Sequence, residues 1–434
     1  MLKLGCHRDG GVTTAVLPIN HRSNLINSNQ ENVWTRLETG VLYLIALAMP
    51  VSIAAANIAF GLGLLLLIRR AFTGGMKDRG VWNSVTLLIV AMGLWDLVAV
   101  LVSDYPIAIK HWGEDKWVFV AAFLPFALVR DVRRGTYALY LMMLSGLVTA
   151  SVALFQNISG YDPLRDKLLE DHGGSYMAVG FFTHHLTYGG IALLILFTTV
   201  AWGVFGPGRS SPIRAAFVNL LAAVGLFATF ARSALVGIGG GGLALLMLAP
   251  KKLRLWIIGV GIAGVVGLLV LSPGMMTRFQ YFSAGSPDSA NESARWRLWG
   301  TAINIIEAHP VFGVGEPNWR YAFKEYKIPG HYVSVAHPHC DFLSAGVDGG
   351  IVAMVIFVAL FAAYFRQGAV DLRDIASDHP ARWGIVAGLT GVAGILIAGL
   401  FQNYLTDAEV GNIVWFMVGM SLVLGNLARK EQHG

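Results

Sequence analysis

Long apolar stretches separated by short polar segments dominate this sequence. A helix that crosses the hydrocarbon core of a bilayer needs about 20 largely apolar residues. Stretches that suit this length occur at about 41–68 (two helices, with a break near Pro50), 81–102, 117–128, 137–155, 186–205, 215–230, 234–248, 257–271, 342–365, 383–400 and 413–428. The pattern predicts an all-α, polytopic integral membrane protein with about 12 transmembrane helices.

One long polar segment interrupts this pattern. Residues 272–341 are rich in Gly, Pro, Trp and charged side chains, and we expect them to form a large loop outside the membrane that contains helices. The first 37 residues are polar and lack the apolar core of a signal peptide, so they are expected to be a cytoplasmic tail. The expected organisation is a tail at 1–37, nine membrane helices in 38–271, the loop at 272–341, three helices in 342–428, and a short tail at 429–434.

Lysine and arginine residues are concentrated in alternate connecting segments. Cytoplasmic loops of membrane proteins carry an excess of these residues. The basic segments contain Arg69, Arg70, Lys77 and Arg79; Arg130, Arg133 and Arg134; Arg209 and Arg214; Lys251, Lys252 and Arg254; Arg366, Arg373 and Arg382; and Arg429 and Lys430. This alternation predicts an even number of helices with both termini in the cytoplasm, and it puts the 272–341 loop on the opposite face.

The composition supports a membrane protein and argues against nucleic-acid binding. Hydrophobic residues make up 55% of the chain and charged residues 13%, whereas soluble domains contain about 25% charged residues. The net charge of +6 arises from the short basic clusters, and no basic stripe interleaved with aromatic residues is present. Cys6 and Cys340 are expected on opposite faces of the membrane, so neither a disulfide nor a cysteine metal site is predicted.

The long loop is expected to contain a helix that begins near Ser289. Ser289 and Glu292 have the spacing of a capping box. On this helix Arg295 and Trp299 share one face, because they are four residues apart. The helix could lie on the membrane surface with Arg295 and Arg297 against lipid phosphates, or its arginine could serve a binding site.

Arg232 follows a short turn between two apolar helices and is the one charged residue in a long apolar stretch. Its guanidinium could cap a helix C-terminus or extend to the lipid headgroups. It could instead bind an anionic lipid head, because a guanidinium stays charged and makes bidentate contacts with phosphate. The sequence leaves both interpretations open.

A pair of histidines precedes a membrane helix. Proline is favoured at the first helical position, which predicts His337 near the N-cap and His339 within the first turn. The positive end of the helix dipole would keep an imidazole neutral and available as a base, and Asp341 could orient a ring. A structural cap and a metal site that includes His331 are the alternatives. The loop lacks a metal-ligand spacing such as His-Glu-x-x-His, so no metal is expected.

Other polar positions give weaker signals. His184 and His185 begin another outward-facing helix end, where they could line the same site or lie at the interface. Asp96 lies inside a predicted transmembrane helix, where ionisable residues are often functional. The Gly-Val-Gly sequence at 313–315 follows no strand, so we expect a flexible turn rather than a nucleotide-binding loop. The absence of a Walker-type sequence also argues against ATP use.

Together these motifs resemble the O-antigen ligase and polymerase superfamily of bacterial membrane glycosyltransferases. The matching elements occur in order: Ser-Asp-Tyr-Pro at 103–106, the turn with Arg232, Arg295 with Trp299, His-Pro-Val-Phe-Gly-Val-Gly at 309–315, His-Pro-His at 337–339, Phe-Leu at 342–343, and Gly-Gly at 349–350. Cys340 departs from the family, which usually has Asn after the histidine. The reactive histidine could therefore be His337 or His339.

The resemblance implies glycosyl transfer at the periplasmic face of the bacterial inner membrane. The donor would be a glycan on undecaprenyl pyrophosphate and, in the ligase branch, the acceptor would be the lipid A–core oligosaccharide. Arg232 and Arg295 would stabilise the charge that develops on the leaving diphosphate, with no nucleotide, metal or other cofactor. His337 or His339 would take the proton from the acceptor hydroxyl, and direct displacement would invert the anomeric centre. Grooves between helices would hold the lipid chains.

Six further residues are weaker candidates for contacts to the substrates: Arg297, Trp299, Arg320, Lys324, His184 and His185. An O-antigen polymerase of the same superfamily is the main alternative to a ligase, which we favour on overall resemblance. A lipid-glycan flippase or other transporter is a third possibility. It would need charged residues along a transmembrane path, and beyond Asp96 and Asp348 these are scarce.

Overall fold

The computed structural model describes residues 20–105, 109–171, 175–255, 257–259, 261, 287–330 and 337–433. Most of these residues are helical, as predicted, and the strands form one short antiparallel hairpin. The elements are α1 (Asn20–Ala48), α2 (Ile53–Phe72), α3 (Ser84–Val102), α4 (Ile109–Lys116), η1 (Trp117–Phe119), α5 (Val120–Leu128), α6 (Val132–Ser159), β1 (Tyr161–Asp162), β2 (Lys167–Leu168), α7 (His185–Phe205), η2 (Pro207–Ser210), α8 (Pro212–Phe227), α9 (Arg232–Leu248), α12 (Pro287–Ala308), α13 (Trp319–Tyr326), α14 (Asp341–Asp374), α15 (Ala381–Ala398) and α16 (Ala408–His433).

Seven helices of the described residues are long and apolar enough to cross a membrane: α2, α3, α6, α7, α14, α15 and α16. The helices α8 and α9 are apolar but shorter. The chain is thus an all-α, polytopic membrane protein, although the predicted total of 12 helices is not confirmed. One reason is that α5 has only nine residues, and another is that most of the predicted helix at 257–271 lies outside the described residues.

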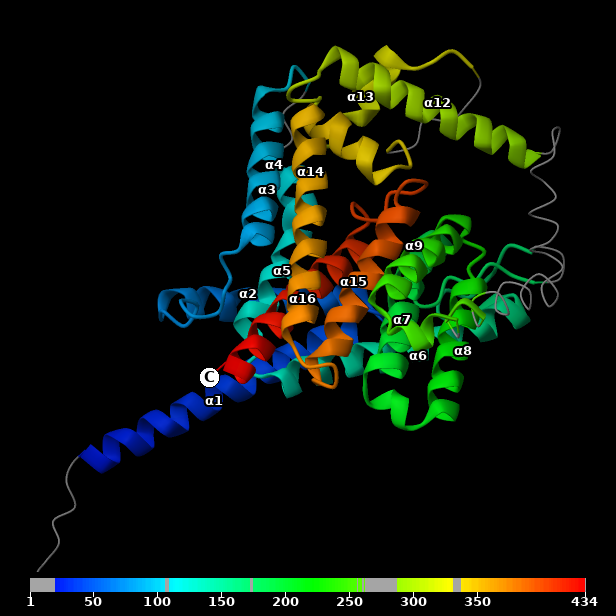
Figure 1. Cartoon of the computed structure of the whole chain (residues 1–434). Coiled ribbons are helices and arrows are strands. Elements are labelled where there is room, and N and C mark those ends of the chain that lie inside the picture. Colours follow the sequence, from blue (N-terminus) through cyan, green and yellow to red (C-terminus); the bar gives the residue numbers. More distant parts are fainter. Residues whose placement is uncertain are drawn as a thin grey trace, which may run out of the picture.

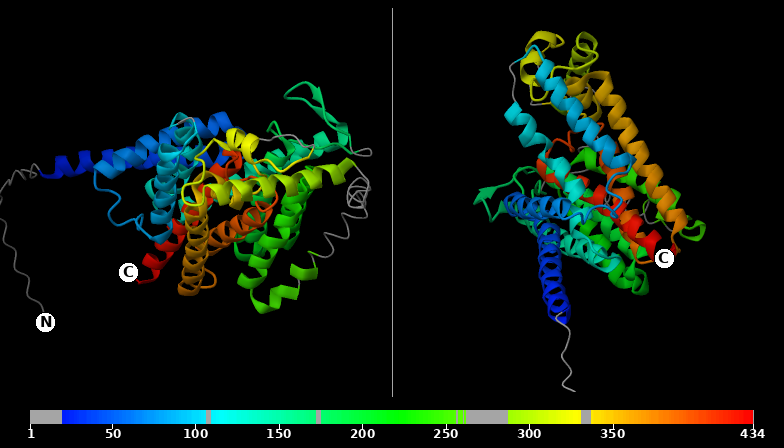
Figure 2. Two further views of the ribbon diagram at one scale, coloured as in Figure 1. Left: turned by 90° about the horizontal axis from the view of Figure 1, so that it is seen from above. Right: turned by 90° about the vertical axis from the view of Figure 1, so that its left-hand side faces the viewer.

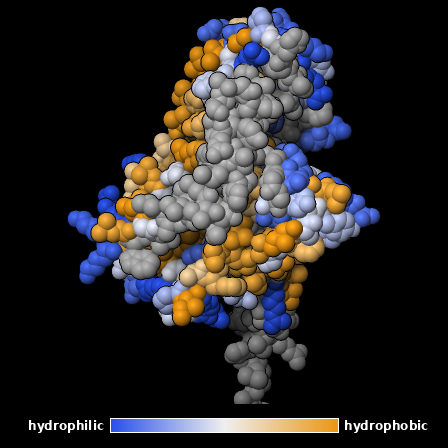
Figure 3. All heavy atoms as spheres, turned by 90° about the vertical axis from the view of Figure 1, so that its right-hand side faces the viewer, coloured by the Kyte–Doolittle hydropathy of each residue, from blue (hydrophilic) through white to orange (hydrophobic). Residues whose placement is uncertain are grey.

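The long helices form a bundle, and a layer of helices crosses one end of it (Figure 1). In the bundle α15 packs against α7, α9 and α16, while α5 packs against α16 and α3 packs against α14. The layer consists of α12 and α13, and a view from above shows α12 lying across the bundle (Figure 2). Hydrophobic side chains cover much of the flank of the bundle, as lipid contact requires (Figure 3).

The predicted basic segments meet at one end of the bundle. Asn426 Nδ2 donates to the carbonyl of Arg79 (2.8 Å), and Arg79 donates to the carbonyl of Val129 at the end of α5 (2.6 Å). The fully buried carboxylate of Glu38 accepts from both Nε and a terminal nitrogen of Arg130. These contacts join four segments of the chain that the charge pattern assigned to the same face.

The candidate site segments meet at the other end. Thr187 Oγ1 at the start of α7 donates to the carboxylate of Asp407 (2.6 Å), just before α16. Asn403 donates to Ser344 Oγ in the first turn of α14 (2.5 Å). The connection between α15 and α16, residues 399–407, is therefore a common partner of several helices at this end, and we call it the α15–α16 loop.

The helix α14 is broken at Gly349 and Gly350, and the 309–315 segment fills the break. The carbonyls freed by the break accept hydrogen bonds, that of Val347 from the N–H of Val314 (2.8 Å) and that of Asp348 from the N–H of Gly315 (3.0 Å). Gly350 adopts φ = 68°, and a Cβ there would lie 2.3 Å from a backbone oxygen of 309–315. The prediction of a flexible turn at 313–315 is therefore wrong, because this segment is fixed against a helix backbone.

The outer layer has a small hydrophobic core of its own. Leu298, Ala302 and Ile305 of α12 pack with Trp319 and Phe323 of α13, and all five side chains are buried. This core also includes Val314 and Val347, so it continues onto the first part of α14. The layer is thereby attached to the same half of α14 that carries the histidines at its start.

Candidate functional site

The chain reaches α14 through a sharp turn at the two predicted histidines. The helix begins at Asp341 with Cys340 as its N-cap, and His339 has a left-handed backbone with φ = 56°. The prediction that Pro338 opens the helix and that His339 lies in its first turn is therefore wrong. Tertiary contacts override the local preference of proline, because the N–H of Asp341 donates to the carbonyl of Gly399 (2.7 Å) in the α15–α16 loop.

His339 is held by a side chain from this loop. Its Nδ1 lies 2.7 Å from the side-chain oxygen of Gln402. An amide oxygen only accepts hydrogen bonds, so Nδ1 carries the proton and Nε2 keeps its lone pair when the ring is neutral. In contrast, Nδ1 of His337 accepts from the backbone N–H of His339 (3.3 Å), which leaves the proton of a neutral His337 on Nε2.

Burial keeps both imidazoles neutral. It lowers the pKa of His337 to about 4, with a further contribution from His339. Burial also lowers the pKa of His339, against the opposing effect of the Gln402 hydrogen bond, and the positive charge of Arg295 and the proximity of His184 lower it further. The predicted neutral imidazole is therefore supported, but through desolvation rather than through the helix dipole.

The buried carboxylate of Asp341 anchors the α15–α16 loop. It accepts from the N–H of Tyr404 (3.0 Å) and from the N–H of Leu405 (3.1 Å). Asp341 therefore orients a loop. The sequence had suggested that it orients an imidazole ring. Its role links the start of α14 to the segment that carries Gln402.

The same loop connects to Arg232. Tyr404 is fully buried, and its hydroxyl lies 2.9 Å from Oγ of Ser233. Ser233 is the second residue of α9 and Arg232 is the first. The positive charge of Arg295 also acts on the Tyr404 hydroxyl. The loop thus brings the first turn of α9 and the α12 arginine to the same end of the bundle as His339.

The position of Arg232 is electrostatically unfavourable for a purely structural cation. The N-terminus of a helix carries a partial positive charge, and a guanidinium there is repelled. Phe230, two residues earlier, has a left-handed backbone with φ = 53°. Left-handed conformations of bulky residues are strained and cluster at functional sites. Phe230 and His339 both lie beside the candidate site, and this is consistent with a binding role for the turn before α9.

The structure places the six weaker candidates in two groups of three. His184 is the N-cap of α7, and its ring centroid lies 4.6 Å from that of His185. His184 is close enough to His339 to lower the pKa of its imidazole. Trp299 packs against Phe401 of the α15–α16 loop, with ring centroids 5.9 Å apart. These three residues therefore surround the same loop.

The other three lie on the outer layer. The guanidinium of Arg297 packs against Gly330, where an added Cβ would lie 2.9 Å from it. It lies away from the helix face that carries Arg295 and Trp299. Arg320 and Lys324 are exposed on α13. Within the described residues no contact joins these two to His337 or His339, so the structure does not bring them into the site.

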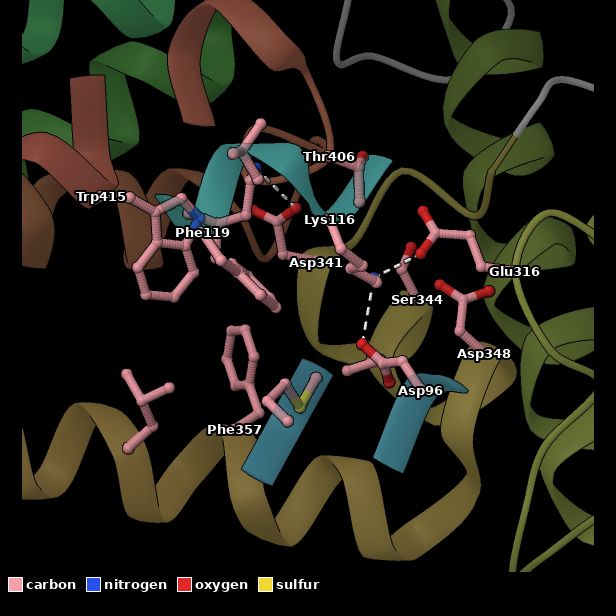
Figure 4. A pocket seen from close by; sticks show the side chains of 15 residues that line it. Asp96, Lys116, Phe119, Glu316, Asp341, Ser344, Asp348, Phe357, Thr406 and Trp415 are labelled. Carbon is pink, nitrogen blue, oxygen red and sulfur yellow. Dashed lines mark hydrogen bonds and ion pairs between the residues drawn. The ribbon is translucent and has the colours of Figure 1, made fainter. Parts of the chain in front are cut away.

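A separate buried ion cluster lies behind the α15–α16 loop. Nζ of Lys116 is 3.1 Å from the carboxylate of Asp96 and also pairs with Glu316, which follows the 309–315 segment. These groups line a cavity of about 60 Å³ together with Asp341 and Asp348 (Figure 4). Asp96, the one intramembrane acid singled out above, is thus paired with a lysine that the sequence did not highlight.

The metal alternative named His331 as a ligand beside His337 and His339. His331 lies outside the described residues, and among those described no group of three His, Cys, Asp or Glu side chains could hold a metal ion. The rings of His337 and His339 are 4.6 Å apart. A neutral imidazole that feels the positive charge of Arg295 suits proton transfer next to an anionic leaving group.

Four residues of the site were missed in the sequence: Ser233, Asp341 in its anchoring role, Gln402 and Tyr404. The signal that could have found the last two is the polar run Gln402-Asn403-Tyr404 between two apolar helices. A pattern of charged residues does not indicate uncharged side chains such as Gln402 and Tyr404. They form the hydrogen bonds that hold the charged residues in place.

Comparison with known proteins finds similarity over this part of the chain. A family model described as O-antigen ligase matches residues 217–358, a segment that contains Arg232, Arg295, His337 and His339. A curated O-antigen ligase of Pseudomonas aeruginosa is 26% identical over 275 residues, which cover 63% of this chain and 61% of that relative. The matched region thus spans about three fifths of the relative. Over residues 217–358, which include most of the candidate site, the chain is therefore similar to the O-antigen ligase family.

Proposed function

We propose that this chain transfers O-antigen polysaccharide from undecaprenyl pyrophosphate to the lipid A–core oligosaccharide, at the periplasmic face of the bacterial inner membrane. The observation that carries the proposal is the assembly around the α15–α16 loop. That loop contacts His339 through Gln402 and the first turn of α9 through Tyr404. The loop thereby links the proposed base to the turn that carries Arg232, and the positive charge of Arg295 acts on the same imidazole.

His339 is the base in this proposal. Its neutral ring presents the Nε2 lone pair, whereas a neutral His337 presents an N–H. The acceptor hydroxyl gives its proton to Nε2 of His339 as its oxygen bonds to the anomeric carbon. The bond from that carbon to the diphosphate breaks, and its electron pair leaves with undecaprenyl pyrophosphate. Attack opposite the leaving group inverts the anomeric centre, and the step consumes no nucleotide.

Arg295 and Arg232 stabilise the leaving diphosphate. Planar guanidinium groups match phosphate oxygens and remain charged at every physiological pH. Such fixed charges act most strongly where charge develops in the transition state. Loss of one of them should raise the barrier by about 3 kcal/mol, which is roughly a 10²-fold loss of rate.

The test is reconstitution with both substrates. Purified protein in lipid vesicles is mixed with lipid-linked O-antigen and lipid A–core, without ATP or added metal, and products are separated by gel electrophoresis. Full-length lipopolysaccharide supports the ligase. Longer lipid-linked glycan alone would identify a polymerase, and movement of lipid across the bilayer without either product would identify a flippase.

Single substitutions test the residue roles. Arg295→Ala, Arg232→Ala and His339→Ala should lose transfer while they remain folded. His379→Ala is a matched control, because His379 contacts Glu431 (3.3 Å) among the basic segments at the opposite end of the bundle, and it should retain transfer. Full activity in the His339 variant would remove that residue from the mechanism.

A further inference from the structure

The partner of the proposed base is an unusual choice for a residue that must orient an imidazole. Gln402 is buried with only 8% of its surface exposed, and its oxygen lies 2.7 Å from Nδ1 of His339. A carboxylate is a common partner in this position in other enzymes. Here the partner is an uncharged amide, and the backbone around it is fixed on both sides.

The flanking residues of Gln402 are held by independent contacts. Gly399, three residues earlier, accepts from the N–H of Asp341 (2.7 Å). Asn403, the next residue, donates to Ser344 Oγ (2.5 Å), and Tyr404 donates to the carboxylate of Asp341. Gln402 thus stands on a segment tied to the same helix, α14, that begins two residues after His339.

We propose that Gln402 is the positioning residue of this site: it fixes the ring orientation and tautomer of His339, so that Nε2 faces the acceptor hydroxyl, while it adds no negative charge. The inference rests on the proposed function. Its physical reason is the donor, whose diphosphate is anionic, so that a carboxylate at 402 would repel the substrate that Arg295 and Arg232 attract. An amide oxygen orients the ring without this penalty.

The charged and titratable groups that face His339 support this assignment. Among the described residues they are Arg295 from α12, His184 from α7 and His337 from its own segment. None of them is a carboxylate. Positive surroundings and burial favour the neutral imidazole, and Gln402 then determines which nitrogen carries the proton.

Three variants separate orientation from charge. Gln402→Leu removes the acceptor, and kcat for transfer should fall at least tenfold with KM for the lipid-linked donor little changed. Gln402→Glu keeps an acceptor and adds a charge, so it should retain more kcat than the leucine variant but raise KM. Gln367→Leu is the matched control, because Gln367 donates to Asp371 (2.8 Å) far along α14, and its transfer kinetics should equal those of the wild type.

A second measurement does not require activity. Diethyl pyrocarbonate modifies neutral imidazole, and fragment mass spectra of the 337–343 region assign the modification to His339. Its pH midpoint should rise by about one unit or more in Gln402→Glu, because a carboxylate stabilises the imidazolium. The midpoint should stay at the wild-type value in Gln367→Leu.

The outcomes separate the two proposals. If wild-type protein forms no lipopolysaccharide but the His339 midpoint rises in Gln402→Glu, the ligase proposal fails and the Gln402–His339 contact stands. If wild-type protein is active and Gln402→Leu has normal kcat, the positioning role is wrong. An unchanged His339 midpoint in Gln402→Glu would also overturn the inference, because the two side chains would then not be in contact.

Discussion

The hydroxyl of Tyr404 and Oγ of Ser233 lie 2.9 Å apart and join the α15–α16 loop to the first turn of α9. Tyr404→Phe should lower the free energy of unfolding by about 1–2 kcal/mol, because Ser233 is left buried without its partner. It should also slow transfer, since the turn that carries Arg232 loses its attachment. Thermal unfolding in detergent and the transfer assay measure the two effects.

Tyr364→Phe is the control for this variant. Tyr364 is also buried, and its hydroxyl donates to Ser421 (3.1 Å) between α14 and α16, away from the site. It should cost a similar amount of stability and leave transfer at the wild-type rate. Equal losses of transfer in both variants would mean that the Tyr404 effect is general destabilisation.

The ion cluster around Lys116 should be essential for stability. Lys116→Ala leaves the carboxylates of Asp96 and Glu316 buried without a cation, which should cost about 3–5 kcal/mol. Combining it with Asp96→Asn and Glu316→Gln should restore part of the loss. Lys110→Ala, which breaks an exposed pair with Glu114, should be nearly neutral. Chemical denaturation of these three variants and the wild type gives the comparison.

The break in α14 should tolerate no side chain at Gly350. Gly350→Ala places a Cβ 2.3 Å from the carbonyl oxygen of Val311 at a backbone φ of 68°, and we expect a loss of roughly 2–4 kcal/mol. Gly242→Ala in α9 meets nothing within 4 Å and should be neutral or slightly stabilising. A stable Gly350→Ala protein would contradict the proposed fit of 309–315 into the helix.

Acid should destabilise the protein through His337. Its folded-state pKa of about 4 is below the ordinary value of 6.5, so the unfolded chain binds the proton first as the pH falls. The contribution to stability is complete above pH 6.5 and is lost progressively toward pH 4, by up to about 3 kcal/mol. His337→Gln should flatten this part of the profile of melting temperature against pH. An identical profile for both proteins would show that His337 does not titrate in this way.

Orientation in the membrane can be tested with single cysteines in a Cys6→Ser, Cys340→Ser background. Lys324→Cys on α13 should react with a membrane-impermeant maleimide added to cells with a permeabilised outer membrane. Arg373→Cys at the end of α14 should react only after the inner membrane is opened. The reverse pattern would put the site on the face that lacks its proposed donor.

The sequence predicted the parts of the fold that depend on hydrophobic periodicity. The helix expected at 186–205 is α7 (His185–Phe205), and the break near Pro50 separates α1 from α2. It could not predict the start of α14, because Asp341 and His339 are fixed by contacts to the α15–α16 loop, about sixty residues later in the chain. For the same reason, the pairing of Lys116 with Asp96 could not be read from local spacing.

The candidate site was predicted through its charged and aromatic residues. Arg295 acts on His339, and the residue after Arg232 contacts Tyr404. The choice between His337 and His339, however, depended on which nitrogen each ring uses in a hydrogen bond. A motif contains no such information. Arg320 and Lys324 were proposed from charge alone, and their exposed positions on α13 do not support them.

The docking of 309–315 into α14 has a mechanical consequence. The eight residues from Asp341 to Asp348 belong to the same helix as the membrane-embedded part below. The freed carbonyls of Val347 and Asp348, however, accept hydrogen bonds from the 309–315 segment, which joins α12 to α13. This short piece is held on two sides, by the 309–315 segment of the chain and by the α15–α16 loop. The outer layer and the loop that carries Gln402 are therefore both attached to the same eight residues, so that a movement of either one would reach the start of α14 beside His339.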